Sequence, residues 1–308
     1  DKQVINKLTR ELYERKKKDV EISHILIKLP KQPSPTDTAR AYSEAMKAWQ
    51  ELQDENTSFK KLALKYSDDN SVKQNKGYLG YVTAKFPDGF YALENAAYET
   101  SVGKISKPVR TRSGYHIVKV HDSRPARGTI EAAHILIRPE NDTASAKERI
   151  NDIYRKLEDG ADFKALAKEY SQDDKTAEKG GYIGSFGINS YDEEFEEAAF
   201  SLEENGAYTK PIKSRIGWHI IQRIDKKKLP PYYKIKDRLK AQISNDQRMK
   251  EAQDEMIERI QREGNFNAND DRIAALLDSL DKSVLSYRWK KPKTEQAKVL
   301  FSLGEDEE

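Results

Sequence analysis

The sequence predicts an α+β fold in which one small domain occurs twice. Three observations predict it: a repeated order of segments, short apolar segments of strand length, and helical spacing of apolar residues between them. The matching pairs include HILI (24–27 and 134–137), SFKKLALKYSDD with DFKALAKEYSQD, and KPVRTRSGYHIVKV with KPIKSRIGWHIIQR. The separation between matching segments drifts only from 102 to 110 residues, so the repeat unit has the length of a whole domain.

Each copy shows the order strand, helix, helix, strand, helix, strand. HILI is a short apolar run bounded by polar residues, which predicts a strand. Apolar residues recur at helical spacing over 42–49 and 150–157, and a second helix follows Ser58 or Asp162, whose side chains can cap it. The segments GYLGY and GYIGS predict a glycine-rich turn and strand, and GYHIVKV and GWHIIQR predict the last strand. So few strands favour a small sheet.

The repeat divides the chain into five predicted parts. They are an N-terminal helical flank (1–20), a first domain (21–122), a short turn-rich linker (123–130), a second domain (131–225) and a C-terminal helical region (226–308). In the C-terminal region we expect one long polar helix that ends near Gly264 and a shorter helix over Asp271–Val284. These flanks bury too little apolar surface to fold alone. Because the sequence starts at Asp1, within a predicted helix and without an initiator methionine, we expect the chain to be a piece of a longer protein.

Composition excludes several classes of function. Lys and Arg total 55 against 52 Asp and Glu, a net charge of +3, which is too balanced for a nucleic-acid-binding protein. There is no cysteine, so disulfides, thiol nucleophiles and cysteine metal sites are excluded. The sequence contains no apolar run near 18 residues, so it predicts no transmembrane helix. It also contains no signal peptide.

Each copy contains two histidines and one aspartate that follows a serine. They are His24, Asp69 and His116 in the first copy, and His134, Asp173 and His219 in the second. Histidines at strand positions can be hydrogen-bonded core residues with no further role. Surface positions differ freely between the copies while both histidines keep their places, which favours a functional role.

Three other kinds of site fit the sequence less well. A metal site of two histidines and a carboxylate is chemically possible, but the HxxxH and HExxH spacings are absent. A Ser–His–Asp hydrolase would need a serine on a nucleophile turn, and Ser113 of the first copy is replaced by Ile216 in the second. The GGYIG segment lacks the GK[ST] sequence of a phosphate-binding loop.

The segments SHILI, DFKALAKEYSQD, KGGYIGSFG, FEEAAFSL and KPIKSRIGWHII, taken in series, resemble a parvulin-type peptidyl-prolyl cis–trans isomerase domain. The resemblance covers 21–122 and 131–225, and two such domains with helical flanks resemble SurA-type and PpiC-type folding factors of the bacterial envelope. It implies a four-stranded antiparallel sheet wrapped by helices, with the two histidines on adjacent central strands. It also implies unfolded or extended proline-containing polypeptides as partners, no cofactor or metal, a periplasmic or cell-envelope location, and a C-terminal region that belongs to a larger chaperone module.

The resemblance assigns roles to particular residues. The catalytic positions are His24, Asp69, Thr111 and His116 in the first domain, and His134, Asp173, Ser214 and His219 in the second. The substrate-binding positions are Leu79, Phe90 and Leu93 in the first domain, and Ile183, Tyr191 and Phe195 in the second, with Phe90 matched to Tyr191. In apolar surroundings the aspartates are expected to have a raised pKa.

The second domain is expected to be the better catalyst. It keeps the family's loop length and the aromatic Phe195, whereas the first domain has Leu93 at that position and a loop two residues longer. The alternative is a binding module of a different class, in which the parvulin domains hold extended peptides without isomerising them.

Overall fold

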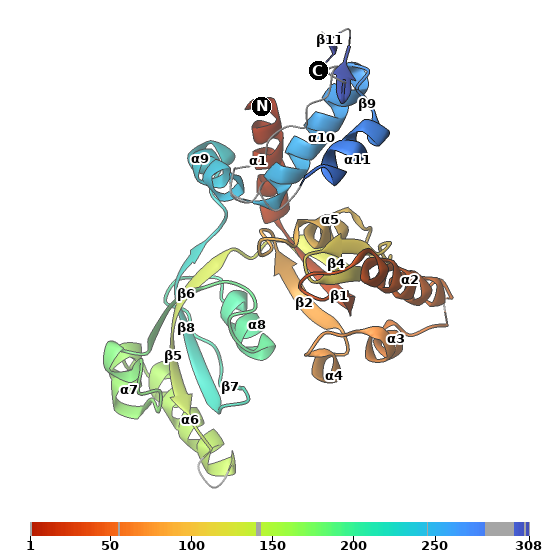
Figure 1. The fold of residues 1–308 in the computed structure, drawn as a ribbon. Coiled ribbons are helices and arrows are strands. Elements are labelled where there is room, and N and C mark those ends of the chain that lie inside the picture. Colours follow the sequence, from red (N-terminus) through yellow and green to blue (C-terminus); the bar gives the residue numbers. More distant parts are fainter. Residues whose placement is uncertain are drawn as a thin grey trace. The chain divides into compact units, whose positions relative to one another are not determined.

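The computed structural model describes residues 2–54, 56–139, 143–244, 246–280, 299–304 and 306–307. Within residues 2–242 the two copies of the repeat form two domains of the same plan, each a four-stranded antiparallel sheet with helices on both faces (Figure 1). We call the copy from β1 to β4 domain 1 and the copy from β5 to β8 domain 2. The predicted α+β fold and its duplication are confirmed.

The sheet of domain 1 is built around two long central strands. Its strands are β1 (Lys18–Lys28), β2 (Tyr78–Thr83), β3 (Val109–Thr111) and β4 (Gly114–Pro125), in the spatial order β2-β1-β4-β3. The residue pattern alone predicted three strands, because β3 is too short to show an alternation of apolar and polar residues. Pro125 pairs with Lys18 at the end of β4, so the strand extends into the segment predicted as linker.

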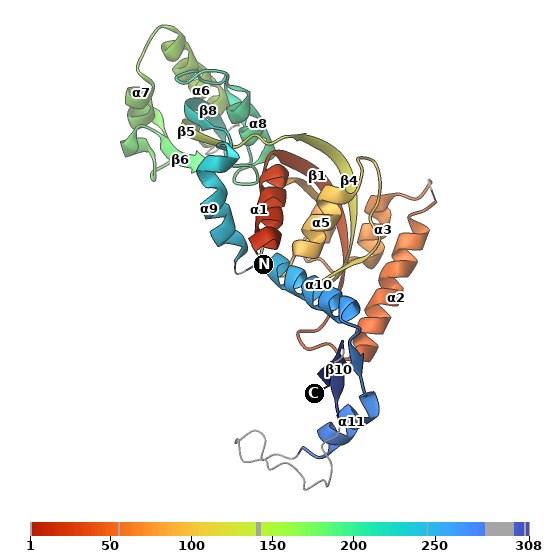
Figure 2. The ribbon, with the colours of Figure 1, turned by 90° about the horizontal axis from the view of Figure 1, so that it is seen from above.

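Helices cover both faces of this sheet (Figure 2). They are α2 (Pro35–Glu51), α3 (Phe59–Tyr66), the short α4 (Val72–Asn75) and α5 (Tyr91–Glu99). Ile25 and Ile117 pack on one face against α2 and α3, while Ile22 and Val118 pack on the other against α5. Ser58 stands at the N-cap of α3 as predicted, but its side chain makes no capping hydrogen bond.

Domain 2 repeats this arrangement. Its strands β5 (Thr129–Ile137), β6 (Tyr182–Phe186), β7 (Ile212–Lys213) and β8 (Trp218–Lys227) have the order β6-β5-β8-β7. Its helices are α6 (Thr143–Glu158), α7 (Phe163–Tyr170), the 3-10 turn η1 (Ala177–Lys179) and α8 (Glu193–Ser201). The Asp162 side chain caps α7 by accepting a hydrogen bond from the backbone N–H of Ala165.

One glycine in each glycine-rich turn is required by the strand beside it. Gly77 and Gly181 have φ angles of +83° and +79°, in the left-handed region that favours glycine. A Cβ at these positions would lie 2.6 Å from the carbonyl oxygen of His24 and 2.2 Å from that of His134, respectively. The two glycine carbonyls accept the backbone N–H groups of the same histidines at 2.8 Å. The glycine of each turn therefore packs directly against the backbone of the first histidine.

The flanks are helical, but the C-terminal part differs from the prediction. The helices are α1 (Lys2–Lys16), α9 (Tyr232–Ile243), α10 (Gln247–Glu263) and α11 (Asp270–Asp278). The predicted single long helix is wrong, because Asp246 caps a new helix by accepting from the Arg248 N–H. Gly264 does end α10, whereas α11 stops at Asp278 and Val284 lies outside the described residues. None of the helices described is long and apolar enough to cross a membrane.

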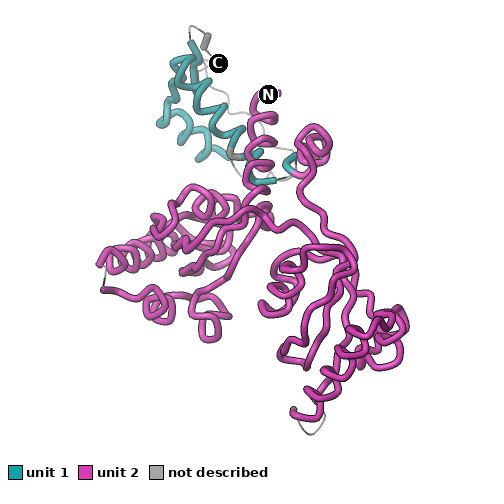
Figure 3. Tube along the Cα trace, turned by 180° about the vertical axis from the view of Figure 1, so that it is seen from behind, with its two compact units in different colours: residues 1, 243–308 teal, residues 2–242 magenta. Residues whose placement is uncertain are grey.

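The chain divides into two compact units (Figure 3). Residues 2–242 form one unit, which contains α1, both domains and α9 almost entirely. Residue 1 and residues 243–308 form the other. Besides α10 and α11 it contains a sheet of three short strands: β9 (Asn267–Ala268), β10 (Phe301–Leu303) and β11 (Asp306–Glu307).

Candidate active sites

The sheet register brings the two histidines of each domain together. In domain 1, Leu26 on β1 lies opposite His116 on β4, so His24 and His116 share one face of the sheet as diagonal neighbours. Their Nδ1 atoms are 3.3 Å apart, and the equivalent atoms of His134 and His219 are 3.2 Å apart. The rings stack at centroid distances of 5.5 and 5.3 Å, and all four side chains are buried. The predicted pairing is confirmed.

A serine before each aspartate docks the acidic segment beside the histidine strand. Ser67 Oγ accepts the backbone N–H of Leu26 at 3.1 Å, and Ser171 Oγ accepts that of Leu136 at 3.1 Å. Each bond ties the segment to the strand two residues beyond the first histidine. The aspartate that follows is thereby held within reach of the imidazole.

In domain 2 the polar side chains form one continuous chain of hydrogen bonds. Ser214 Oγ lies 2.8 Å from His219 Nε2, and His134 Nε2 lies 2.9 Å from Asp173 Oδ2. An ionised carboxylate only accepts, so His134 donates from Nε2 and, being neutral, accepts at Nδ1. His219 therefore donates from Nδ1 and accepts the Ser214 hydroxyl at Nε2. Thr176 completes the chain by donating to Asp173 at 2.6 Å.

Domain 1 has the same chain with a weaker acidic end. Thr111 Oγ1 lies 2.9 Å from His116 Nε2, as Ser214 does in domain 2. The contact between His24 Nε2 and Asp69 Oδ2 is longer, at 3.2 Å, and lacks the geometry of a hydrogen bond. Asp69 Oδ1 instead accepts the hydroxyl and the backbone N–H of Ser71, at 2.6 and 2.8 Å.

Burial keeps the histidines neutral. Desolvation lowers the pKa of all four, because an imidazolium in these positions would lose its hydration. For His116 and His219 the pKa falls to about 3, with the neighbouring His24 or His134 as a further cause. Each site therefore presents an uncharged pair of imidazoles.

The prediction of a raised aspartate pKa is wrong. Partial burial does raise the pKa of Asp69 and Asp173 and is the largest single influence on each. Hydrogen bonds from Ser71 or Thr176 and the contact with the histidine together outweigh it, so the pKa of both carboxyl groups lies below the usual value. Both aspartates are ionised at neutral pH.

A pocket of about 220 Å³ opens beside His219 in domain 2, and the ion pair of Asp192 and Arg215 forms part of its wall. Its lining includes Tyr191, Phe195, Ile216, Ser214 and His219. The Phe195 ring meets the His219 ring edge to face at 5.2 Å and stacks on Tyr191 at 4.7 Å. The structure thus brings together four of the residues that the resemblance selected.

Ile183, the other predicted substrate-binding residue of domain 2, is not in this lining. It packs instead with Phe186 and Phe195 in the core beneath. The sequence could identify it as apolar and close to the site, but not decide on which side of Phe195 it would lie.

The pocket side of domain 1 is built from different residues. Leu93 is buried in the core with Leu79 and Val118 beside it. The aromatic ring next to His116 belongs to Phe90, with centroids 5.9 Å apart. Phe90 is the N-cap residue of α5, the position that Asp192 occupies in α8, so the match between Phe90 and Tyr191 is wrong.

Sequence reasoning missed two groups of residues at these sites. Asp192 binds Arg215 through contacts of 2.6 to 3.4 Å at the rim of the domain 2 pocket. Glu94 and Glu196 occupy equivalent positions in α5 and α8 and are both buried. The segments ALENAAY and EFEEAAF, which both contain this glutamate, were a usable signal, since a buried glutamate needs partners.

The comparisons with known proteins agree with this geometry. The family "Rotamase: PPIC-type PPIASE domain" matches residues 24–122 and 134–225. The chain is similar to the chaperone SurA of Hahella chejuensis, with 33% identity over 74% of this chain and 52% of that protein. It is also similar to the chaperone SurA of Photorhabdus laumondii, with 32% identity over 83% and 60% of the two chains. This chain therefore spans little more than half the length of these relatives.

A solved structure of the peptidylprolyl isomerase PrsA from Bacillus anthracis is also similar, with 39% identity, a TM-score of 0.31, and coverage of 38% of this chain and 51% of that one. The family and the relatives support a role as a prolyl isomerase or a chaperone. Since the family matches well over half of the chain, the protein belongs to the PpiC-type peptidyl-prolyl cis–trans isomerase family and contains two copies of its domain.

Proposed function

We propose that this protein isomerises Xaa–Pro bonds in unfolded or extended client polypeptides, and that domain 2 is the faster of its two sites. The observation that carries this proposal is the pocket of about 220 Å³ in domain 2, where aromatic rings lie over an uncharged histidine pair. A pocket of this size with aromatic side chains in its wall fits a prolyl ring.

The reaction makes and breaks no covalent bond. It twists an amide whose resonance sets a barrier of roughly 18–20 kcal/mol, so catalysis requires tighter binding of the twisted form than of either planar form. Tyr191 and Phe195 would hold the prolyl ring and exclude water, which favours the less polar twisted amide. The hydrogen-bonded chain beneath would fix the ring of His219 and so the shape of the pocket floor. The chemistry requires no metal or cofactor.

Domain 1 supports a second function. Its histidine pair is complete, but Leu93 replaces the aromatic ring of Phe195 and Phe90 lies on His116 instead. We propose that this domain mainly binds extended segments of the client. The similarity to chaperones named SurA supports client holding by the whole protein and a location in the periplasm or cell envelope.

The experiment compares Phe195→Leu with Phe200→Leu in the full chain. Both residues lie on α8 and are buried in the same core, but only Phe195 lines the pocket. Removing a ring from a packed site is worth a few kcal/mol, and half of that lost from the transition state means about tenfold or more in rate. A protease-coupled assay should show this loss for Phe195→Leu only. Equal rates for the two variants would contradict the proposal.

A further inference from the structure

A buried glutamate occupies the same position in both pocket helices but has different partners. Glu94 on α5 is fully buried, with 0% of its surface exposed, and Glu196 on α8 is 7% exposed. A buried carboxylate is stable only where hydrogen bonds or cations compensate its charge. The partners of each glutamate therefore show which part of the molecule that helix is built to hold.

In domain 2 the partners come from the pocket loop itself. Glu196 Oε1 accepts the backbone N–H groups of Ser190 and Tyr191 at 2.6 and 2.9 Å, and Oε2 accepts that of Asn189 at 3.0 Å. Three consecutive amides thus converge on one carboxylate. These three bonds lie within domain 2 and fix the loop that presents Tyr191 to the pocket. The Asn189 side chain also donates to the carbonyl oxygen of Tyr81 in domain 1.

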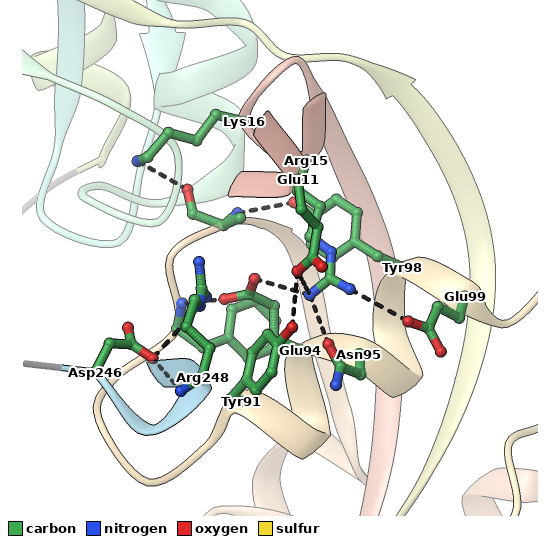
Figure 4. A network of polar contacts seen from close by, with 12 residues as sticks. Glu11, Arg15, Lys16, Tyr91, Glu94, Asn95, Tyr98, Glu99, Asp246 and Arg248 are labelled. Carbon is green, nitrogen blue, oxygen red and sulfur yellow. Dashed lines mark hydrogen bonds and ion pairs between the residues drawn. The ribbon is translucent and has the colours of Figure 1, made fainter. Parts of the chain in front are cut away.

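In domain 1 the carboxylate binds both the loop before α5 and a helix outside the repeat. Glu94 Oε2 accepts the backbone N–H of Phe86 at 2.8 Å, while Oε1 lies 3.1 Å from Nη1 of Arg15 on α1. Arg15 is itself buried, and its guanidinium also donates to Asn95 at 2.7 Å and Glu99 at 3.3 Å (Figure 4). One side chain of α1 therefore contacts more than one helical turn of α5.

Two neighbours of Arg15 on α1 bind the same region. Lys16 Nζ donates to the carbonyl oxygen of Ala84 at 3.0 Å, and Glu11 Oε1 accepts the Tyr91 hydroxyl at 2.9 Å. Together with the bond from Phe86 to Glu94, these contacts hold both ends of the loop over 84–91. Phe90, whose ring lies against His116, is in this loop at the start of α5.

We infer that α1 is a working part of the domain 1 site, with Arg15 as a positioning residue that sets the pocket loop through Glu94. Domain 2 holds the backbone of its loop through its own Glu196. A change in α1 should therefore alter peptide binding at domain 1 and leave domain 2 as it was. The inference rests on the proposed peptide binding by domain 1.

The first test follows the loops directly by hydrogen exchange with mass spectrometry on the full chain. Arg15→Gln removes the positive charge of Arg15, and Arg15→Lys keeps a charge but lacks the several N–H donors of the guanidinium. Lys7→Gln is the control, because it removes an exposed cation from the same helix. Arg15→Gln should speed exchange over 84–91 by about tenfold, the effect of losing one or two buried hydrogen bonds. Exchange over 187–191 should not change, and Lys7→Gln should change neither loop. Arg15→Lys should recover part of the protection.

Glu196→Gln provides the reciprocal experiment. An amide keeps one acceptor oxygen but turns an NH₂ group toward a backbone donor, so exchange over 187–191 should rise while 84–91 stays protected. Unchanged exchange over 84–91 in Arg15→Gln would overturn the inference. So would an equal rise in both domains, because that would show general unfolding and no positioning of one loop.

The second test measures peptide affinity at domain 1 in a Phe195→Ala background, which disables the domain 2 pocket. Arg15→Gln should weaken binding of a labelled proline peptide about three- to tenfold, and Arg15→Lys should recover part of it. Failure of the parent to bind would reject the proposed function of domain 1 and the inference with it. Intact binding in Arg15→Gln would reject the inference alone.

Discussion

Domains 1 and 2 share a fold and a histidine pair, yet they differ in the apolar residues that cover that pair and in how the neighbouring loop is held. Domain 2 places Phe195 on His219 and anchors its own loop through Glu196. Domain 1 buries a leucine at the Phe195 position, lays Phe90 on His116, and shares its glutamate with α1. After duplication, the polar floor has changed little and the apolar pocket has changed most. The proposed difference in function, isomerisation in domain 2 and peptide binding in domain 1, therefore depends on the apolar residues around the histidine pair and not on the identity of the polar groups.

The largest expected effect comes from a change in the glycine turn beside the first histidine, which both domains contain. Gly181→Ala should destabilise domain 2 on the order of 3 kcal/mol, because the new Cβ meets a backbone oxygen in a left-handed conformation. Gly184→Ala is the control, since Gly184 also has a positive φ of +87° but nothing within 4 Å. Domain-resolved chemical denaturation measures both variants. Similar losses in the two would show that strain alone, and no contact with His134, explains Gly181.

Acid should destabilise both domains through their histidines. An unfolded histidine has a pKa near 6.5, whereas burial lowers the pKa of His116 and His219 to about 3. Between these values the unfolded state binds more protons, so stability is complete above pH 6.5 and falls as the pH drops. At pH 5 each of the two histidines should cost about 2 kcal/mol.

Urea unfolding at pH 7 and pH 5, resolved to β4 and β8 by pulsed hydrogen exchange, measures this loss. His219→Gln should remove much of the pH dependence from domain 2 and none from domain 1. An undiminished pH dependence in β8 of that variant would contradict the assignment.

The aspartates at the end of the two hydrogen-bonded chains should contribute unequally to the stability of their domains. Asp173→Asn should destabilise domain 2 by about 1–2 kcal/mol, because His134 and Thr176 both donate to this carboxylate. Asp69→Asn should cost domain 1 less than half as much, since its contact with His24 is no hydrogen bond and Ser71 satisfies it locally. The same domain-resolved unfolding compares the two, and equal losses would show that the difference in geometry has no energetic consequence.

The smallest expected effect concerns the residue before proline. Asp192 neutralises Arg215 at the rim of the domain 2 pocket, whereas Arg112 at the equivalent position of domain 1 forms no ion pair with any residue the structure describes. Asp192→Asn should raise the rate on a Glu–Pro peptide relative to an Ala–Pro peptide about two- to threefold, as expected for an exposed charge. Asp225→Asn, at the far end of β8, is the control, and high salt should abolish the effect.

Much of this site could be predicted from the sequence because the repeat compares the protein with itself. His24, His116 and their counterparts stood out since they persisted while their surroundings changed. Their pairing followed from two adjacent strands. The lowered aspartate pKa could not be foreseen, because it depends on hydroxyl donors such as Thr176, placed by a turn whose geometry no periodicity encodes.

Two further errors have the same origin. The match of Phe90 to Tyr191 failed because a loop of different length cannot be aligned uniquely from sequence. The start of the helix shows that Phe90 is equivalent to Asp192. The contacts of Arg15 could not be predicted because its partners lie about 80 residues away in the sequence and α1 itself has no counterpart in the second copy.

The hydrogen-bonded chain of domain 2 has a polarity, and that polarity decides what the pocket can offer a substrate. Each proton points from Ser214 toward Asp173, and reversing the sequence would require a proton on a carboxyl group whose pKa is lowered. A prolyl peptide bound in this pocket, as we propose, would therefore meet oxygen lone pairs and no acidic hydrogen. Isomerisation there would require no proton transfer. Turnover in heavy water should match turnover in ordinary water, and rates should be flat with pH wherever the domain remains folded.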